Sequence, residues 1–325
     1  MSITISMAPL HGVTNRVFRN AFVRHFRGFD YAMAPFILSI PAPRSRNAHF
    51  KDLFPEYNTR LPLVPQILSN DAVAFAQTAS ALAELGYAEV NWNLGCPYPM
   101  VTGKRRGSGL LPYPESIERF LAEACALSPL PVSIKLRLGL VDAREIMAIM
   151  PVLEAFPLKR IIIHPRIASQ LYDGSIDLDA FAGAASLSGR EVGYNGDIRD
   201  VSTWRSLAAR FPKVNEWMIG RGAISDPFLP GRIKGASLPD DPKVALEAFH
   251  EDLYFGYRET LAGQKHALDK MKEIWSYLGS SFSSDGYGQK EIRKAFSFEA
   301  YEKAVRAVFS EERWVAGTNV ETTAG

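Results

Sequence analysis

The sequence predicts an α/β protein, a (β/α)8 TIM barrel followed by a C-terminal helical domain. Eight short apolar runs rich in valine, isoleucine and aromatic residues recur along the first two thirds of the 325-residue chain, and most precede a stretch with helical periodicity. No glycine fingerprint of the dinucleotide-binding kind follows the first run, which counts against an open parallel sheet. After about Leu238, amphipathic helical patterns continue without intervening strands.

The predicted elements follow from these patterns in chain order. The strands are expected at 3–9, 30–36, 61–67, 87–93, 131–137, 160–166, 190–196 and 216–222. Helical periodicity is clear at 71–86 and 114–127, and again after a turn-rich linker at 243–263, 265–282 and 297–314. We therefore expect a catalytic barrel over 1–237, a helical domain over 242–314, and a mobile tail at 315–325, where apolar residues are few.

Composition limits the class of protein. With 47% hydrophobic and 22% charged residues, the chain has an ordinary globular composition, and its formal charge of +2 does not by itself indicate a nucleic-acid partner. No apolar run approaches the roughly 20 residues of a membrane span, and the N-terminus lacks a signal-peptide pattern. We expect a cytoplasmic, monomeric protein without membrane association. The six histidines show no ligand spacing, so no metal site is predicted.

The ends of the predicted strands are unusually polar. The active sites of such barrels lie at the C-terminal ends of the strands, so these residues are candidates for a common site. They are Pro9, Leu10, Gln66, Asn91, Asn93, Lys135, Arg137, His164, Arg166, Asn195, Asp197, Gly220 and Arg221.

Two glycine-containing turns suggest a phosphate site. They follow the seventh and eighth strands, where barrels often bind phosphate at a helix N-terminus. Gly196, Gly220 and Gly222 would allow close approach of the backbone, and Arg221 would add positive charge.

Lys135 and His164 leave two chemistries open. A lysine at a strand end could form a Schiff base if neighbouring cations such as Arg137 lowered its pKa, as in aldolases. Alternatively, the lysine and the histidine could hold negative charge on a reduced ring system.

One of the two cysteines lies at the start of a glycine-rich loop. Cys96 opens the stretch "CPYPMVTGKRRGSGLL" directly after the fourth strand, where its thiol could serve as a nucleophile or as a proton donor. Lys104, Arg105 and Arg106 have no acidic neighbour in this loop, which we interpret as a shaped and movable lid. Cys125 lies among apolar residues at helical spacing and is predicted to be a buried packing residue.

Together, these motifs resemble those of the tRNA-dihydrouridine synthases, bacterial FMN-dependent flavoenzymes. The resemblance rests on "MAPLHGVTNRVFR", "NLGCP" with "VTGKRRGSGLL", "IKLRLG", "HPRIASQLYDG", "NGDI" and "IGRGA", which occur in the family's order. The chain departs from the family pattern at Leu10, where Met is usual, at Asn15 and Asn91, where Asp is usual, and at 167–169, where Thr and a basic residue are common. The departure at 167–169 removes polar groups on the substrate side and does not touch the residues implied for the flavin.

The resemblance implies a cofactor, a reductant and a division of roles. NADPH or NADH would reduce FMN, the flavin would deliver hydride to C6 of a uridine in tRNA, and Cys96 would protonate C5. The implied flavin contacts are Pro9, Leu10, Gln66, Lys135, His164, Asn195, Gly196, Asp197, Gly220 and Arg221. The implied contacts of the target base are Asn93, Arg137, Arg166 and Tyr172.

The tRNA footprint is predicted from clusters of basic residues. Lys104, Arg105 and Arg106 on the loop, with Lys270 and Lys272 in the helical domain, are the candidate RNA contacts. Trp275 and Tyr277 lie at helical spacing and are predicted to pack in the core rather than to stack on bases. The chain length and "DKMKEIWSYL" resemble those of bacterial enzymes that act on the D-loop, and position 16 is favoured.

Three other functions remain open at this stage. An FMN-dependent oxidoreductase of small molecules, resembling dihydroorotate or enoate reductases, would use the same barrel and phosphate site. A Schiff-base aldolase would use Lys135. A non-catalytic RNA-binding barrel is disfavoured because most of the residues that match the family's site are present, Cys96 among them.

Overall fold

The computed structural model describes residues 3–283 and 287–316. It divides into two compact units. The barrel unit comprises the N-terminal segment up to His11, Asp30–Asp197 and Ala208–Met218. The helical unit comprises Gly12–Phe29, Ile198–Leu207 and the chain from Ile219 onward. Whether 1–237 forms one catalytic domain stays a prediction.

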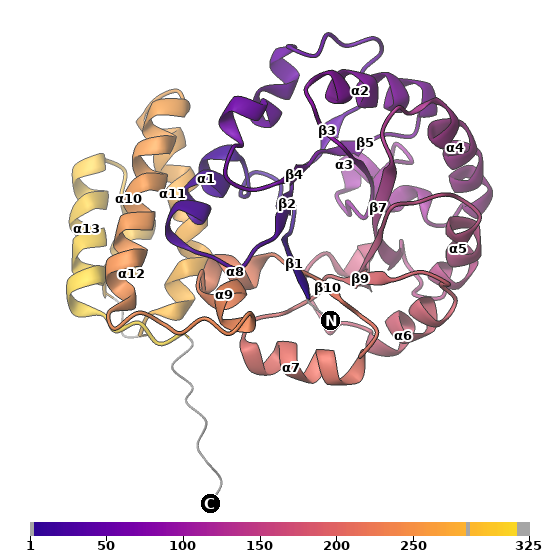
Figure 1. The fold of residues 1–325 in the computed structure, drawn as a ribbon. Coiled ribbons are helices and arrows are strands. Elements are labelled where there is room, and N and C mark those ends of the chain that lie inside the picture. The colour runs from indigo at the N-terminus through magenta and orange to yellow at the C-terminus, as the bar shows by residue number, and fades with distance from the viewer. Residues whose placement is uncertain (1–2, 284–286, 317–325) are drawn as a thin grey trace, which may run out of the picture. The chain divides into compact units, whose positions relative to one another are not determined.

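The barrel unit is built on ten parallel strand segments (Figure 1). They are β1 Thr4–Met7, β2 Tyr31–Met33, β3 Ile37–Leu38, β4 Leu63–Val64, β5 Gln66–Leu68, β6 Val90–Leu94, β7 Val132–Gly139, β8 Ile161–Ile167, β9 Val192–Tyr194 and β10 Glu216–Ile219. Each of the eight predicted strands overlaps at least one of these segments.

The ten segments form eight strands of a closed sheet, because β2 and β3 are consecutive parts of one strand, separated by 34–36, and β4 and β5 are consecutive parts of the next. The order along the sheet is β3-β5-β6-β7-β8-β9-β10-β1-β2-β4. Because only Pro65 separates β4 from β5, these two segments form one strand that pairs with β2 through its first half and with β6 through its second half. The two ends of the order therefore meet, and the predicted barrel is confirmed. Proline has no backbone N–H, which accounts for the break in this strand.

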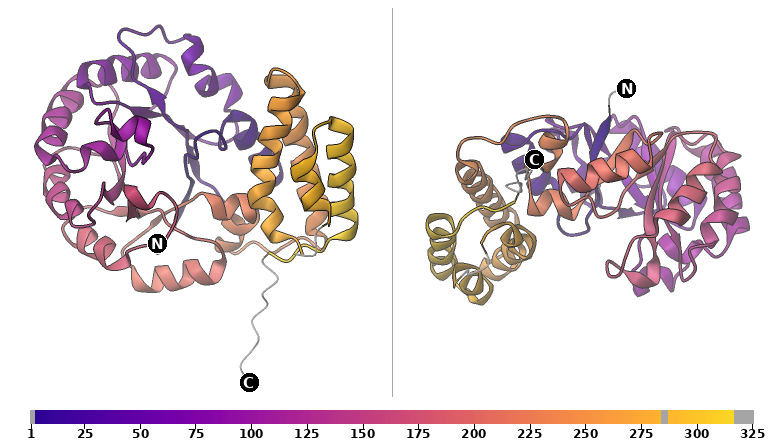
Figure 2. Two further views of the ribbon diagram at one scale, coloured as in Figure 1. Left: turned by 180° about the vertical axis from the view of Figure 1, so that it is seen from behind. Right: turned by 90° about the horizontal axis from the view of Figure 1, so that it is seen from below.

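Helices surround the ring of strands (Figure 2). In the barrel unit they are α2 Ala72–Glu84, α3 Pro99–Thr102, α4 Pro114–Leu127, α5 Glu145–Glu154 and α6 Leu178–Ser186, with 3-10 turns η1 Ala48–Leu53, η2 Pro55–Tyr57, η3 Gly107–Leu110 and η4 Ala168–Gln170. The predicted helices at 71–86 and 114–127 are therefore confirmed as α2 and α4. The side chain of Asp71 caps α2 by accepting a hydrogen bond from the Ala74 N–H at 2.9 Å.

The barrel has an apolar interior below its polar strand ends. Ala8, Tyr31, Met33, Val64, Ile162 and Met218 form one buried cluster inside the ring. Outside the ring, Trp92 stacks on Phe120 of α4 with a centroid distance of 3.8 Å. One prediction is wrong: Cys125 on α4 is only half-buried, because its helix position lies at the edge of the face that packs on the sheet.

The helical unit contains the three predicted C-terminal helices. They are α10 Pro242–Thr260, α11 Gln264–Leu278 and α13 Phe298–Glu311, joined by η5 Gly279–Ser281 and the unpredicted α12 Tyr287–Lys294. Two short helices, α8 Arg221–Ser225 and α9 Leu229–Ile233, precede them, and part of α7 Val201–Arg210 also belongs to this unit. Of the predicted tail at 315–325, residues 317–325 lie outside the described residues.

Helix α1, Arg16–His25, packs against α10 in the helical unit although about 220 residues separate them. Phe22 and Phe26 meet Phe249 edge to face, with centroid distances of 6.1 and 5.1 Å. Asn15, at a position where the family pattern has Asp, caps α1 by accepting hydrogen bonds from the N–H groups of Val17 and Phe18. The substitution therefore keeps the capping oxygen.

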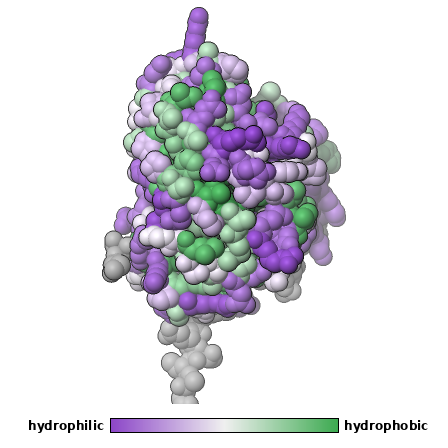
Figure 3. All heavy atoms as spheres, turned by 90° about the vertical axis from the view of Figure 1, so that its right-hand side faces the viewer, coloured by the Kyte–Doolittle hydropathy of each residue, from purple (hydrophilic) through white to green (hydrophobic). Residues whose placement is uncertain are grey.

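On the face that Figure 3 shows, hydrophobic and hydrophilic residues are interspersed. Among the described helices, none combines the length and the apolar composition that a membrane span requires.

Candidate functional site

The strand register places the predicted polar residues on the inner face of the barrel. Lys135 pairs with Ile162, which belongs to the interior cluster, so the Lys135 side chain also faces inward. Side chains alternate between the two faces of a strand, and paired residues of parallel strands share a face. The inward set, from β5 to β8, is therefore Gln66, Asn91, Asn93, Ser133, Lys135, Arg137, His164 and Arg166.

A chain of buried amides links β5, β6 and β7. Asn93 donates from Nδ2 to Gln66 Oε1 at 2.7 Å, and Gln66 donates from Nε2 to Asn91 Oδ1 at 2.7 Å. Asn91 then donates to Ser133 Oγ at 3.0 Å. An aspartate carboxylate at position 91 could not make this last donation, so the departure from the family pattern suits a network that needs a donor there.

Asn93 also fixes the start of the Cys96 loop. Its Oδ1 accepts hydrogen bonds from the N–H groups of Gly95 at 3.1 Å and Cys96 at 2.9 Å. Cys96 is 5% exposed. Burial raises the pKa of the Cys96 thiol, and the Tyr98 N–H and Arg137 oppose this shift without cancelling it. The thiol is therefore protonated at neutral pH and lies within electrostatic range of Arg137.

The loop after Cys96 is held closed at its base. Ser108 donates to the Cys96 carbonyl oxygen from its N–H at 3.1 Å and from its Oγ at 2.6 Å. A Cβ on Gly109 would stand 2.4 Å from the Thr102 carbonyl oxygen, so this position requires glycine. The sequence motif contained Gly107, Ser108 and Gly109, but sequence reasoning did not identify their part in fixing Cys96.

The three loop cations differ in their surroundings. Lys104 and Arg105 are exposed, and the Arg105 guanidinium lies over the Tyr113 ring at 4.8 Å. Arg106 is half-buried and donates from Nε to Asn70 Oδ1 at 3.0 Å. The Asn70 Nδ2 in turn donates to the Lys104 carbonyl oxygen at 3.1 Å.

Burial changes the acidity of two neighbouring bases on β7. Desolvation, with a smaller contribution from Arg137, lowers the pKa of Lys135 to about 7. Desolvation also lowers the pKa of Arg137 to about 10, an effect that Tyr172 opposes and Arg166 reinforces. Arg137 donates to the Ile167 carbonyl oxygen at 2.9 Å, and its guanidinium lies 5.2 Å from the Tyr172 ring centre.

Arg166 is 1% exposed and points into the protein. Its guanidinium forms a bidentate ion pair with Asp197, with distances of 3.1 Å from Nη1 to Oδ1 and 2.6 Å from Nη2 to Oδ2. It also lies 3.3 Å from His164 Nε2.

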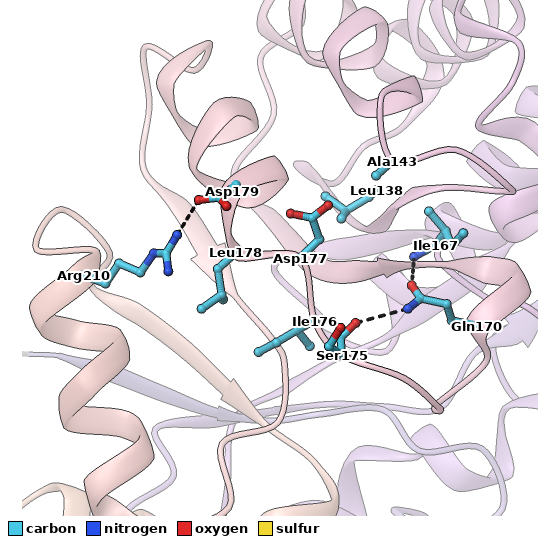
Figure 4. A pocket seen from close by; sticks show the side chains of 10 residues that line it. All are labelled: Leu138, Ala143, Ile167, Gln170, Ser175, Ile176, Asp177, Leu178, Asp179 and Arg210. Carbon is cyan, nitrogen blue, oxygen red and sulfur yellow. Dashed lines mark hydrogen bonds and ion pairs between the residues drawn. The ribbon is translucent and has the colours of Figure 1, made fainter.

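The loop that carries Tyr172 is well connected. Gln170 accepts from the Ile167 N–H at 3.0 Å and donates to the Ser175 carbonyl oxygen at 3.1 Å (Figure 4). Leu171 adopts a positive φ of 51°, which is strained for a side chain of this size. The Tyr172 ring stacks toward His164 with a centroid distance of 6.4 Å. Gln170 and Ile167 also line a pocket of about 470 Å³, which no predicted site residue lines.

The two glycine turns lie in different units. In the barrel unit, Asn195 donates to the Met218 carbonyl oxygen at 2.8 Å, and a Cβ on Gly196 would stand 3.0 Å from Pro165. In the helical unit, Gly220 is the N-cap of α8, the helix that begins at Arg221, and a Cβ on Gly222 would stand 2.0 Å from the Ile198 carbonyl oxygen. A joint phosphate site of the two turns stays a prediction.

The remaining predicted residues are less closely connected. Pro9 and Leu10 follow β1 and are half-buried. In the helical unit, Lys270 is half-buried and forms an ion pair with Glu273, and Lys272 is half-buried. Trp275 is buried and donates to the Tyr301 hydroxyl at 2.9 Å, which confirms it as a core residue. Tyr277 is half-buried.

Comparison with known proteins identifies related sequences over most of the chain. The family model described as dihydrouridine synthase matches residues 6–312. A tRNA-dihydrouridine(16) synthase from Cupriavidus necator is 30% identical and aligns over 84% of this chain and 87% of its own length. A tRNA-dihydrouridine synthase B from Vibrio vulnificus is 27% identical, over 82% of this chain and 86% of the relative.

Solved structures share the barrel at low sequence identity. The old yellow enzyme from Trypanosoma cruzi matches 80% of this chain and 95% of its own, with a TM-score of 0.52 and 11% identity. Morphinone reductase matches 76% of this chain and 88% of its own, with a TM-score of 0.51 and 13% identity. These similarities concern the fold alone.

Proposed function

The chain belongs to the dihydrouridine synthase family, and on that premise we propose that it reduces the C5–C6 double bond of a uridine in tRNA, with FMN as cofactor and NADPH or NADH as reductant. One observation carries the proposal. A buried thiol with a raised pKa, Cys96, lies within electrostatic range of Arg137 on a polar inner face at the C-terminal ends of the strands. This arrangement suits delivery of a proton to a ring that is acquiring negative charge.

The donor set of the inner face fits a flavin. Gln66 and Lys135 would hold the polar edge of the ring together with His164, and Pro9 and Leu10 would lie against its apolar surface. The two glycine turns would hold the ribityl chain and phosphate through Asn195, Gly196, Asp197, Gly220 and Arg221. When bound, FMN supplies the hydride that adds to C6 of the uracil.

The protein's own groups would complete the reduction. The 5,6 bond of uracil is conjugated to a carbonyl group, so hydride addition at C6 develops negative charge on the pyrimidine. Arg137, a cation beside Cys96, would stabilise that charge. Cys96 would then transfer its thiol proton to C5. The hydride added at C6 and the proton added at C5 together complete the two-electron reduction of the double bond. The raised pKa keeps this proton in place before the transfer.

The target base would be held by residues around Cys96. Tyr172 offers a ring next to Arg137, and Asn93 offers the second N–H of its Nδ2, beyond the one that it donates to Gln66. A base in folded RNA cannot reach such a site without leaving its stack, so the uridine must be extruded. The exposed cations Lys104 and Arg105 would contact the RNA backbone. The D-loop is the proposed region and position 16 the first candidate, in line with the 30% identical relative named for that position.

Replacement of the thiol tests the proposal. Cys96→Ala should bind FMN and oxidise NADPH as the wild type does, but it should lose uridine reduction. Cys125→Ala is the matched control, since Cys125 is a half-buried thiol on the outer helix α4, and it should retain full turnover. Normal RNA turnover by Cys96→Ala would exclude Cys96 as the proton donor. Protein that stays colourless after reconstitution with FMN would reject the cofactor.

A small-molecule flavin oxidoreductase is the competing function. The exposed cations of the Cys96 loop favour a larger anionic substrate instead. Turnover of α,β-unsaturated carbonyl compounds or of dihydroorotate without RNA, at rates above those with tRNA, would favour the competing function. Borohydride trapping of a carbonyl substrate on Lys135, whose pKa of about 7 suits an amine nucleophile, would favour an aldolase.

A further inference from the structure

Every N–H group of the Arg166 guanidinium is directed at an acceptor in the protein. Nε donates to the Asp173 carbonyl oxygen at 3.3 Å, and Nη2 donates to the Gly174 carbonyl oxygen at 2.7 Å and to Asp197 Oδ2 at 2.6 Å. Nη1 donates to Asp197 Oδ1 at 3.1 Å and faces His164 Nε2 at 3.3 Å. A guanidinium has five N–H donors and no acceptor, so these five contacts use all of them.

The contact with His164 determines where the imidazole carries its proton. Arg166 can only donate, because a guanidinium is always protonated in a protein. His164 Nε2 must therefore accept, and a neutral imidazole that accepts at Nε2 carries its hydrogen on Nδ1. A proton on Nε2 would place two donors against each other at 3.3 Å inside a buried site.

The same guanidinium joins two loops that have separate proposed roles. Asp173 and Gly174 follow Tyr172 directly, on the loop proposed to hold the target base. Asp197 ends the turn after β9, which is proposed to hold the cofactor, and has a positive φ of 39°. Arg166 thus fixes both loops from a position on β8 that is itself 1% exposed.

We infer that Arg166 is a positioning residue, which holds His164 as the neutral Nδ1–H tautomer and fastens the Tyr172 loop to the Asp197 turn. This replaces the direct substrate contact expected from the sequence, because no donor of the guanidinium is left for a substrate. For the reaction, which rests on the proposed function, His164 then contributes a hydrogen-bond donor and no charge. The positive charge on this part of the inner face then comes from Arg137, and below about pH 7 also from Lys135.

The tautomer can be measured on the protein without cofactor or RNA, so the test is independent of the proposed function. Long-range ¹H–¹⁵N correlation spectra of ¹⁵N-histidine-labelled protein at pH 7 and 8 distinguish Nδ1–H, Nε2–H and doubly protonated rings. The sequence has six histidines, and the spectrum of His164→Gln assigns the signal of interest. The expected wild-type signal is that of the Nδ1–H tautomer. In Arg166→Gln the preference for this tautomer should be lost.

Arg190→Gln is the matched control. Arg190 also donates to two backbone carbonyl oxygens, of Leu158 at 2.9 Å and Glu154 at 3.2 Å, within the same unit. Its loss should leave the His164 signal unchanged. A change of tautomer in Arg190→Gln would indicate general loosening of the barrel and overturn the inference. An Nε2–H or doubly protonated His164 in the wild type would also overturn it, even if Arg166→Gln failed to fold.

The attachment of the loops gives a second readout. Amide hydrogen exchange at 168–176 and around 197 should increase together in Arg166→Gln and stay at wild-type levels in Arg190→Gln. If only one of the two segments loosened, Arg166 would not be the link between them.

Discussion

Gly107 lies so close to Cys96 that a side chain at position 107 has no room: a Cβ there would stand 2.8 Å from the Cys96 carbonyl oxygen and 2.9 Å from the Cys96 Cβ. Gly107 also has a φ of +54°, which favours glycine. The position of the proposed proton donor is thus set by a residue eleven positions further along the chain.

We therefore predict that Gly107→Ala displaces Cys96. Overpacking should lower the free energy of unfolding by about 1 to 3 kcal/mol, in addition to a backbone cost of about 1 to 2 kcal/mol. Gly86→Ala is the control, because Gly86 has a positive φ of +90° and nothing within 4 Å of its added Cβ. Chemical denaturation and turnover assays should show a larger loss of stability and of uridine reduction in Gly107→Ala than in Gly86→Ala. Equal losses would mean that the contact with Cys96 is unimportant.

Lys135 should make the protein more stable as the pH rises above about 7. Its pKa is about 7 in the folded protein and about 10.4 in an unfolded chain, so between these values the unfolded state holds a proton that the folded state has released. Stability therefore rises with pH across this window.

The pH dependence can be isolated by substitution. The unfolding free energy of the wild type minus that of Lys135→Met should be larger at pH 9.5 than at pH 7.5, by about 2 to 3 kcal/mol. Lys213→Met, at an exposed lysine of the same unit, should show no such difference between the two pH values. If the difference in unfolding free energy between the wild type and Lys135→Met were the same at both pH values, the Lys135 ammonium would be exposed to water in the folded protein.

His250 should destabilise the helical unit in acid. Burial lowers the pKa of His250 to about 3, against about 6.5 in an unfolded chain, and the Tyr301 hydroxyl lies 2.7 Å from its Nε2. Between these pH values the unfolded state binds the extra proton, so the stabilising contribution is complete above pH 6.5 and falls as the pH decreases.

The measurement is the free energy of unfolding from pH 7 to 4. His250→Gln should reduce its pH dependence by up to about 1.4 kcal/mol per pH unit below pH 6.5. His266→Gln, at an exposed histidine on α11, should leave the dependence close to that of the wild type. Identical slopes in the two variants would show that His250 takes up its proton without unfolding.

Lys104 and Arg105 should contribute more to tRNA binding than Lys270. Both loop residues are exposed, whereas Lys270 is half-buried and neutralised by Glu273. The double variant Lys104→Glu/Arg105→Glu should reduce the magnitude of the slope of log K against log salt concentration by about 2. Lys270→Glu should reduce this slope by less than about 1. Binding of tRNA between 50 and 200 mM salt measures both slopes. A larger effect of Lys270→Glu would move the RNA footprint to the helical unit.

Sequence patterns alone determined the strands of the barrel and most of its inner face. Apolar runs of β-branched residues can be recognised locally, and strand alternation then assigns residues such as Asn93, Lys135 and His164 to one face. The long C-terminal helices were predictable for the same reason, because amphipathic periodicity is a local property. Cys96 was identified by its position between strand and glycine-rich loop.

Only the tertiary structure decided which partners these residues have. The five acceptor atoms around Arg166 come from separate parts of the chain, so the positioning role that we propose for it was not visible in sequence. The packing of α1 on α10 through Phe22 and Phe249 joins residues 227 positions apart. Likewise, burial sets the acidity of Cys96 and Lys135, and burial depends on neighbours that the fold brings together.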